Sequence, residues 1–264
     1  MTKKRFLMLL GFVFLFSFLW GAGGSSILSP ATKQTSLDQL NTKVGMITDK
    51  AKELPGLYDR LWRIVALKSA VATKVNSQSA VPLRNIPLTL QQAIIAVEDQ
   101  RFYRHIGFDI EGIIRATLVN MQSGELVEGG STITQQLVKN LFLSHERTMV
   151  RKVEELILSV DMELRYSKEE ILEMYLNNIY FGSNSYGIGQ AAKTYFAKTP
   201  DKLTLGECAL LAGLPNAPSL YSPYENLKAS QERQAVVLQA MVRHGYIGPS
   251  AALEAKAAPL KLAR

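Results

Sequence analysis

The segment from Glu98 to Gly107 gathers acidic, basic and aromatic side chains at one point of the sequence. Glu98 and Asp99 follow an apolar run whose side chains at positions 90, 93, 94 and 97 fall on one helical face. A carboxylate at such a helix end can take a proton from a substrate hydroxyl if burial or a nearby negative charge raises its pKa, and Asp99 offers that charge. The alternative is a solvated helix end with His105 as a structural cap.

A second polar segment spans residues 129–140, where two glycines and two hydroxyl residues precede a helical pattern. Free backbone N–H groups at a helix start can bind an anion. Gln135, Gln136 and Lys139 add polar groups in the next turn, although their neighbours are apolar. The spacing does not match G-x-x-x-x-G-K-[ST], so this is not a Walker loop. A cap role for Ser131 alone would not explain the two glutamines and the lysine.

A third polar group is the stripe formed by Arg147, Arg151 and Glu155, which are spaced four residues apart. An exposed ladder of ion pairs is the ordinary explanation, and it stabilises a helix only slightly. The other face of the same helix carries apolar residues that we expect in the core: Val150, Val153, Ile157, Val160 and Leu164.

Glu98 and Glu155 together could supply the two carboxylates that flank a sugar carbon in glycosidic chemistry. Lys139, Arg147 and Arg151 suit a diphosphate, because arginine binds phosphate oxygens bidentately. Hydrolysis of a neutral polysaccharide would not need these cations. The sequence therefore favours glycosyl transfer from a phosphorylated donor.

The elements that must position these residues are mainly helices, and convincing strand patterns are scarce. One helix should begin near Thr89, whose capping box with Gln92 precedes the run that ends at Glu98. The other helices are predicted at 109–124, 132–143, 147–165, 168–178, 186–196, 204–213 and 226–244.

The N-terminus predicts export. Residues 1–5 are basic, and residues 6–24 form an uncharged apolar run about as long as a membrane-spanning helix. We expect a transmembrane anchor there, with a cleaved signal peptide as the alternative. Residues 25–80 form a partly helical stalk or linker. The net charge of +7 indicates an anionic partner, either nucleic acid, anionic lipid or a phosphorylated substrate. The single cysteine excludes a disulfide within one chain.

Taken together, these segments resemble the peptidoglycan glycosyltransferase family, which occurs in class A penicillin-binding proteins and in monofunctional transglycosylases. Five family segments occur here in order, and they are EDQRFYRHIGFD (98–109), GGSTITQQLVKN (129–140), RKVEE (151–155), ILEMYLNNIYFG (171–182) and LAGLPNAPSLYSP (211–223).

The resemblance implies a lysozyme-like, mainly α-helical domain at 81–247, with a membrane-associated subdomain and a C-terminal tail at 248–264. It implies polymerisation of lipid II into glycan strands, with inversion and release of undecaprenyl diphosphate. Glu98 matches the general base, and Glu155 matches a second essential glutamate whose role is open between the leaving diphosphate and a divalent cation such as Mg²⁺ or Mn²⁺. Neither a metal site nor a cofactor follows otherwise.

The remaining implied site residues bind substrate. Asp99, Phe102 and His105 match the first motif on the acceptor side, whereas the donor-side positions are Ser131, Gln135, Gln136, Lys139, Asn140, Arg147 and Arg151. The implied partners are lipid II, the growing glycan strand, the membrane and other cell-wall synthesis proteins, but not nucleic acid. The implied location is the bacterial cytoplasmic membrane, with a single span and the catalytic domain on the outer, periplasmic face.

One departure from the family pattern and one absent motif bear on this resemblance. Asn184 stands where the family pattern Phe-Gly-x-Gly-x-Tyr-Gly has its second glycine, and asparagine tolerates a positive φ, so we expect the turn to survive. No serine is followed by lysine three residues later, so the S-x-x-K motif of a transpeptidase is missing. The alternatives are a lytic glycoside hydrolase on a lysozyme-like scaffold and a catalytically silent scaffold protein.

Overall fold

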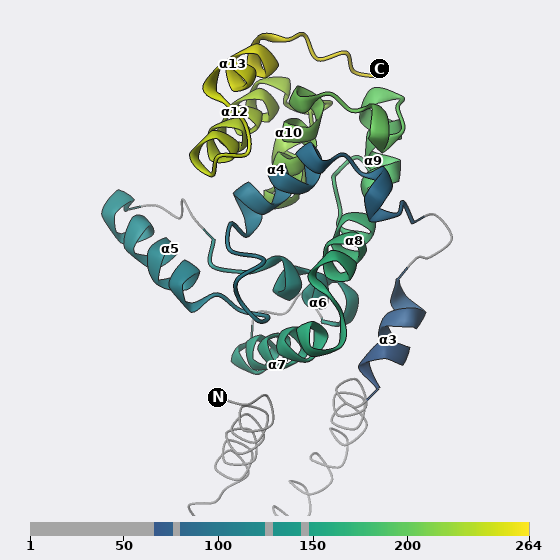
Figure 1. The fold of residues 1–264 in the computed structure, drawn as a ribbon, viewed down its shortest axis with the longest axis vertical. Helices are drawn as coiled ribbons and strands as arrows, with labels where there is room; N and C mark the ends of the chain where they lie inside the picture. Colours follow the sequence, from purple (N-terminus) through teal and green to yellow (C-terminus); the bar gives the residue numbers. More distant parts are fainter. Residues whose placement is uncertain (1–65, 76–79, 125–128, 144–147, 264) are drawn as a thin grey trace, which may run out of the picture. The chain divides into compact units, whose positions relative to one another are not determined.

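Helices account for nearly all regular structure in the computed structural model, which describes residues 66–75, 80–124, 129–143 and 148–263 (Figure 1). Within these ranges the only β pairing is two isolated bridges, Ile106 with Phe108 and Tyr180 with Tyr186. The expected mainly α fold is therefore confirmed for this part of the chain. The predicted anchor at 6–24 and nearly all of the stalk lie outside the described residues.

One group of helices packs around α10 (Leu205–Gly213). Its neighbours are α4 (Leu88–Glu98), α12 (Leu227–Arg243) and α13 (Pro249–Ala257). All side chains of α10 from position 206 to 213 are buried, because the apolar run around Cys208 can face helices on more than one side. This group holds the C-terminal end of α4, and with it Glu98, in a fixed position.

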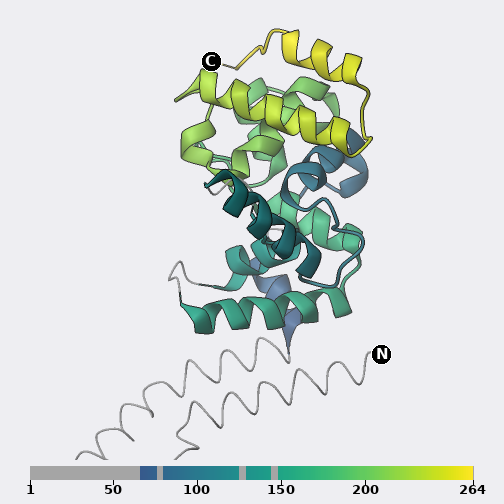
Figure 2. The same cartoon turned by 90° about the vertical axis from the view of Figure 1, so that its left-hand side faces the viewer.

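A second group packs around α6 (Ile133–Phe142), which contacts α7 (Met149–Arg165) and α8 (Lys168–Asn178). Both views show this group beside the first (Figures 1 and 2). α8 also contacts α9 (Ile188–Phe196), and α7 contacts α3 (Leu67–Lys74). The short helical elements are η2 (Leu83–Asn85), η3 (Pro200–Lys202), η4 (Leu214–Asn216) and α11 (Pro218–Tyr221).

Helix α5 (Ile110–Ser123) extends away from both groups in Figure 1 and crosses in front of them in Figure 2. The sequence predicted its extent closely. One face of α5 carries large apolar side chains at helical spacing, and this face is exposed and not packed on the core. Its large side chains are 42–76% exposed, and they are Ile110, Ile113, Ile114, Leu118 and Met121.

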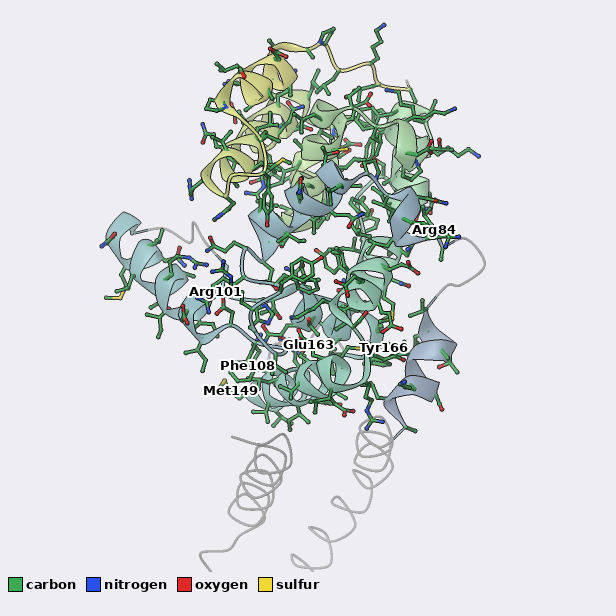
Figure 3. All side chains as sticks on the ribbon, viewed as in Figure 1. Arg84, Arg101, Phe108, Met149, Glu163 and Tyr166 are labelled. Atoms are coloured by element: carbon green, nitrogen blue, oxygen red, sulfur yellow. The ribbon has the colours of Figure 1, made fainter. Side chains whose placement is uncertain are left out.

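The predicted orientation of α7 was wrong in its first turns. Val150 and Val153 are more than half exposed, whereas Glu155 is buried on the same helix. Met149, at the N-terminal end, is also exposed and lies at the margin of the molecule in Figure 3. The reason is that α6 and α8 cover the face of α7 that includes Glu155 and Leu158, so the early valines point away.

One predicted cap was also wrong. No side chain caps α4, which begins after Pro87, and the Thr89 hydroxyl instead lies 3.7 Å from the Cys208 sulfur. Proline at this position fixes φ for the helix entry without a capping side chain. At α6, the cap is Thr132 and not Ser131, with Gln135 completing the capping box.

The loop at 181–187 keeps its turn despite the missing glycine. Asn184 has φ of 56°, as expected for an asparagine in a glycine position, and Ser183 before it has φ of 45°. Gly187 (φ 81°) is a true glycine position, since a Cβ there would lie 2.5 Å from the Asn177 carbonyl oxygen.

The segment predicted as a C-terminal tail contains α13, which packs on α12 and α10. Further on, the Ala263 N–H donates to the Tyr195 carbonyl over 2.9 Å. The tail is thus attached to the first helix group. Among the described residues, no helix has both the length and the apolar character needed to span a membrane.

Candidate active site

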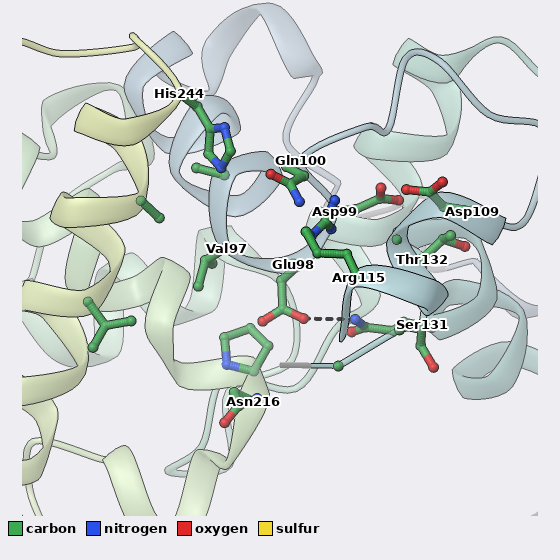
Figure 4. A pocket seen from close by; sticks show the side chains of 18 of the residues that line it. Val97, Glu98, Asp99, Gln100, Asp109, Arg115, Ser131, Thr132, Asn216 and His244 are labelled. Carbon is green, nitrogen blue, oxygen red and sulfur yellow. Dashed lines mark hydrogen bonds between the residues drawn. The ribbon is translucent and has the colours of Figure 1, made fainter. Parts of the chain in front are cut away.

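A cavity of about 390 Å³ lies between the two helix groups, with Glu98 on its wall. In Figure 4 the Glu98 carboxylate occupies the centre of the view, with Asn216, Ser131, Arg115 and His244 around it. The wall combines the end of α4, the 129–132 segment, the last two residues of η4 and faces of α5, α6 and α12. Segments far apart in sequence therefore meet at Glu98.

One carboxylate oxygen of Glu98 has a hydrogen-bond partner, and the other has none among the described residues. Its Oε2 accepts a hydrogen bond from the Gln136 side-chain nitrogen over 2.7 Å (Figure 4). Its Oε1 is buried and has no protein partner among the described residues. An unsatisfied buried carboxylate oxygen is costly, and such groups are found where a ligand or a reacting group supplies the missing donor.

The pKa of Glu98 is raised above its ordinary value, and burial of the carboxyl is the main cause. The Gln136 hydrogen bond and the positive charges of Arg233 and Lys139 act against the rise, while Asp99 adds to it slightly. The sequence allowed either burial or a nearby negative charge as the cause of a raised pKa, with Asp99 as the charge, and here burial dominates. A carboxylate with a raised pKa is suited to accept a proton near neutral pH.

The adjacent glutamines have different positions, although the sequence treated them alike. Gln136 donates to Glu98 and accepts a hydrogen bond from the Tyr175 hydroxyl over 3.1 Å. The buried Gln135 side chain instead accepts from the Thr132 N–H over 3.0 Å and does not line the cavity. The expected substrate contact of Gln135 is thus not seen, because its oxygen completes the α6 capping box.

Asp99 connects the cavity to a buried network of charges behind it. Its carboxylate lies 3.0 Å from His105 Nε2 and accepts the backbone N–H of Ile133 over 3.0 Å. The other ring nitrogen of His105 lies 3.7 Å from Glu163, which pairs with Lys168 over 2.7 Å. Figure 3 shows Glu163 among the helices of the second group.

This network places two first-motif residues behind the cavity wall. His105 is not a helix cap, and neither it nor the fully buried Phe102 lines the cavity. Lys168 Nζ lies 4.5 Å from the centre of the Phe102 ring, a cation–π contact. His105 thus contacts the Asp99 carboxylate directly, and the Phe102 N–H donates to the Asp99 carbonyl oxygen over 2.9 Å. Of the expected acceptor-side residues only Asp99 reaches the cavity.

The predicted donor-side residues divide into three sets. Ser131, Gln136 and Lys139 line the cavity. Gln135, Asn140 and Arg151 do not line it. Glu155, the second predicted catalytic glutamate, does not line it either; it is buried, lies 3.0 Å from Arg151 and is also paired with Lys152. Arg147 lies outside the described residues.

Glu155 differs from Glu98 in its surroundings. Both carboxylate oxygens of Glu155 have cationic partners, whereas Glu98 Oε1 has none among the described residues. The Arg151 Nε is itself buried without a hydrogen-bond acceptor in the described part of the chain. The two glutamates are thus not an equivalent pair across one cleft. In the same described residues, no three metal-ligating side chains cluster in a way that could hold an ion.

Sequence reasoning missed the cavity residues contributed by α12 and α5. Arg233, Val236, Ala240 and Arg243 recur at helical spacing along α12, and this periodicity was the available signal. Gln100 links the two helices when its amide is oriented to satisfy both neighbours. It then donates to His244 Nε2 over 3.0 Å and accepts from Arg115 Nε over 2.8 Å. Asn216 lies within the fifth quoted segment, to which no site residue had been assigned.

Comparisons with known proteins agree with these segments. A family model described as transglycosylase matches residues 66–242. A Cupriavidus necator protein named as a transglycosylase is 46% identical over 182 residues, covering 69% of this chain and 78% of that protein. Penicillin-binding protein 1A of Escherichia coli is 50% identical over 171 residues, covering 62% of this chain and 20% of that protein.

Longer relatives and a solved structure complete the comparison. Penicillin-binding protein 1A of Aquifex aeolicus is 46% identical over 180 residues, covering 68% of this chain and 25% of that protein. The crystal structure of penicillin-binding protein 1A from Haemophilus influenzae aligns with a TM-score of 0.43 at 29% identity, covering 72% of this chain and 19% of that one. The chain thus spans about a fifth to a quarter of the length of these penicillin-binding proteins. By the extent of the family match and the identity to the Cupriavidus necator protein, the chain belongs to the transglycosylase family.

Proposed function

We propose that this protein is a peptidoglycan glycosyltransferase that polymerises lipid II into glycan strands, with Glu98 as the general base. The observation that carries the proposal is the buried Glu98 Oε1, which lies on the wall of a cavity and has no donor among the described residues. A substrate hydroxyl would supply that donor. The raised pKa of Glu98 matches the task of accepting the hydroxyl proton.

The proposed reaction is a single inverting displacement. The acceptor sugar's 4-hydroxyl gives its proton to Glu98 while its oxygen bonds to the anomeric carbon of the donor. The bond from that carbon to the diphosphate oxygen breaks, and its electron pair leaves with undecaprenyl diphosphate. Because this leaving group is already a stabilised anion, the site needs cations more than a strong general acid.

Lys139 is the cation from the predicted donor side that reaches the cavity, and it supports binding of the donor diphosphate there. We propose that Glu155 acts by holding Arg151 and Lys152 in position, since its two oxygens contact these cations. Whether the diphosphate also carries Mg²⁺ or Mn²⁺ is tested by running the assay with and without the metal.

We propose a membrane-associated location, with the catalytic domain on the outer face of the cytoplasmic membrane. Two exposed apolar surfaces support this. They are the α5 face and the start of α7, where Met149 is 81% exposed. The lipid-linked substrate would reach the cavity from such a surface. The missing S-x-x-K motif supports the absence of transpeptidase activity in residues 1–264.

The test is an assay with labelled lipid II on the wild type and on Glu98→Gln. We expect glycan strands from the wild type, and a loss of about 10²–10⁴-fold in the folded variant, which is the usual contribution of a general base. Full polymerisation by a folded Glu98→Gln protein would show that Glu98 is not the base. Release of products from purified peptidoglycan without turnover of lipid II would instead identify a lytic hydrolase.

A further inference from the structure

Arg233 on α12 contributes a positive charge to the same cavity as Glu98, and none of the five family segments contains it. Its guanidinium is held from two sides. The Nε donates to the Gly213 carbonyl oxygen over 3.4 Å, a long hydrogen bond. The guanidinium carbon lies 5.7 Å from the centre of the Tyr221 ring, within the range of a cation–π contact.

The segment at 211–223 therefore forms a cradle for one arginine. A Cβ at Gly213 would lie 2.7 Å from Arg233 Cγ, so glycine is what allows the arginine stem to pass beside α10. The hydrogen bonds seen among the described residues use only the Nε of Arg233. Its two terminal nitrogens thus keep their donors for the cavity.

The position of Arg233 matters because its charge acts on the pKa of Glu98. Of the charged residues that act on the Glu98 pKa, Arg233 lowers it most, followed by Lys139 on α6, while the adjacent Asp99 raises it. Gln136 contacts the carboxylate directly, and the Tyr175 hydroxyl from α8 bonds to Gln136. The other ionisable groups on the cavity wall are Asp109, Arg115, Arg243 and His244.

We infer that Arg233, cradled by Gly213 and Tyr221, is the positioning residue that keeps Glu98 ionised and therefore ready to act as a base. The inference rests on the proposed function of Glu98. Burial favours the protonated carboxyl, which cannot accept a proton, and a cation held in the wall of the same cavity offsets that preference. Lysine could supply the charge but not the planar guanidinium that contacts both Gly213 and Tyr221.

The first test is the pH dependence of kcat/KM for lipid II polymerisation by the full-length chain. In Arg233→Met we expect the acid limb to move to higher pH while the alkaline plateau stays unchanged. A displacement of one pH unit would lower kcat/KM on the acid limb about tenfold, because each pH unit is a factor of ten in the ionised fraction. Arg233→Lys should keep most of the wild-type limb. Gly213→Ala should reproduce the displacement in part by moving the arginine stem.

Lys228→Met is the matched control, because it removes a positive charge from an exposed position on the same helix, outside the cavity. We expect the wild-type profile for it. An Arg233→Met profile that is unchanged, or one that falls equally at every pH with a raised KM, would overturn the inference. The second outcome would make Arg233 a substrate ligand.

A substrate-free measurement separates this inference from the proposed function. The carboxyl carbons of glutamate can be labelled with ¹³C, and the Glu98 signal identified by its loss in Glu98→Gln. We expect its titration midpoint to rise in Arg233→Met and to stay unchanged in Lys228→Met, even if the protein does not act on lipid II. An unshifted midpoint in a folded Arg233→Met protein would refute the inference while leaving the proposed function untouched.

Discussion

Replacing each of the two glutamates by glutamine should change stability in opposite directions. Glu98→Gln removes a buried charge whose Oε1 has no partner in the described residues, and we expect a gain of about 1 kcal/mol near neutral pH. Glu155→Gln removes the carboxylate that lies 3.0 Å from Arg151 and also pairs with Lys152. A charge-assisted hydrogen bond contributes about 1.5–3 kcal/mol, and the half-exposed Lys152 adds less than about 1 kcal/mol.

The expected shifts in melting temperature follow from the size of the domain. About 1 kcal/mol corresponds to roughly 2–4 °C, so Glu98→Gln should melt a few degrees above the wild type and Glu155→Gln about 5–10 °C below it. The difference in stability between Glu98→Gln and the wild type also depends on pH. Because the folded-state pKa of Glu98 is raised, its ionisation lowers wild-type stability as the pH increases from the unfolded value through the folded one. The advantage of Glu98→Gln should therefore vanish near pH 4.

The assay is thermal unfolding followed by circular dichroism at about pH 4 and pH 7.5, paired with lipid II polymerisation on the same preparations. Glu98→Gln should combine higher stability with lost activity, as expected where a destabilising buried charge serves function. Exposed Glu169→Gln is the matched control and should change neither. A Glu98→Gln protein that is less stable than the wild type at neutral pH would refute the reasoning, because Glu98 would then be a stabilising structural group.

Three further predictions follow from other contacts. Gln136→Leu should reduce kcat for lipid II by about tenfold or more, because it removes the hydrogen bond to Glu98. Gln135→Leu should mainly lower the melting temperature, because it removes the capping hydrogen bond of α6. Equal losses of kcat in the two variants would contradict their separate roles. Gly187→Ala should destabilise the domain by about 1–3 kcal/mol in denaturant titrations, since its φ is 81° and a Cβ would meet a carbonyl; an unchanged midpoint would refute this. Leu118→Asp on exposed α5 should weaken co-sedimentation of the full-length chain with anionic vesicles at unchanged melting temperature, and undiminished binding would exclude this face as a membrane contact.

Much of the fold could be predicted from the sequence because helical periodicity is a local property. The predicted helix at 168–178 matches α8, the one at 132–143 differs from α6 by one residue at each end, and the one at 204–213 differs from α10 by one residue at its start. The loop at Asn184 was likewise predictable, since tolerance of positive φ belongs to the residue type. Which apolar faces are buried was not predictable in this way, as α5 and the start of α7 show.

For the candidate site, too, the sequence indicated which residue types are present, whereas the tertiary structure decided which of them meet. Residue types and ordered segments were enough to nominate Glu98, Gln136 and Lys139, because a base, an amide and a cation have chemistry of their own. Only the tertiary structure separated Gln136 from Gln135, since one bonds to the base and the other caps its own helix. Only it brought Arg233, 135 residues away in the sequence, to the cavity of Glu98. Burial and long-range charge set the state of that carboxyl, and neither can be read from neighbours along the chain.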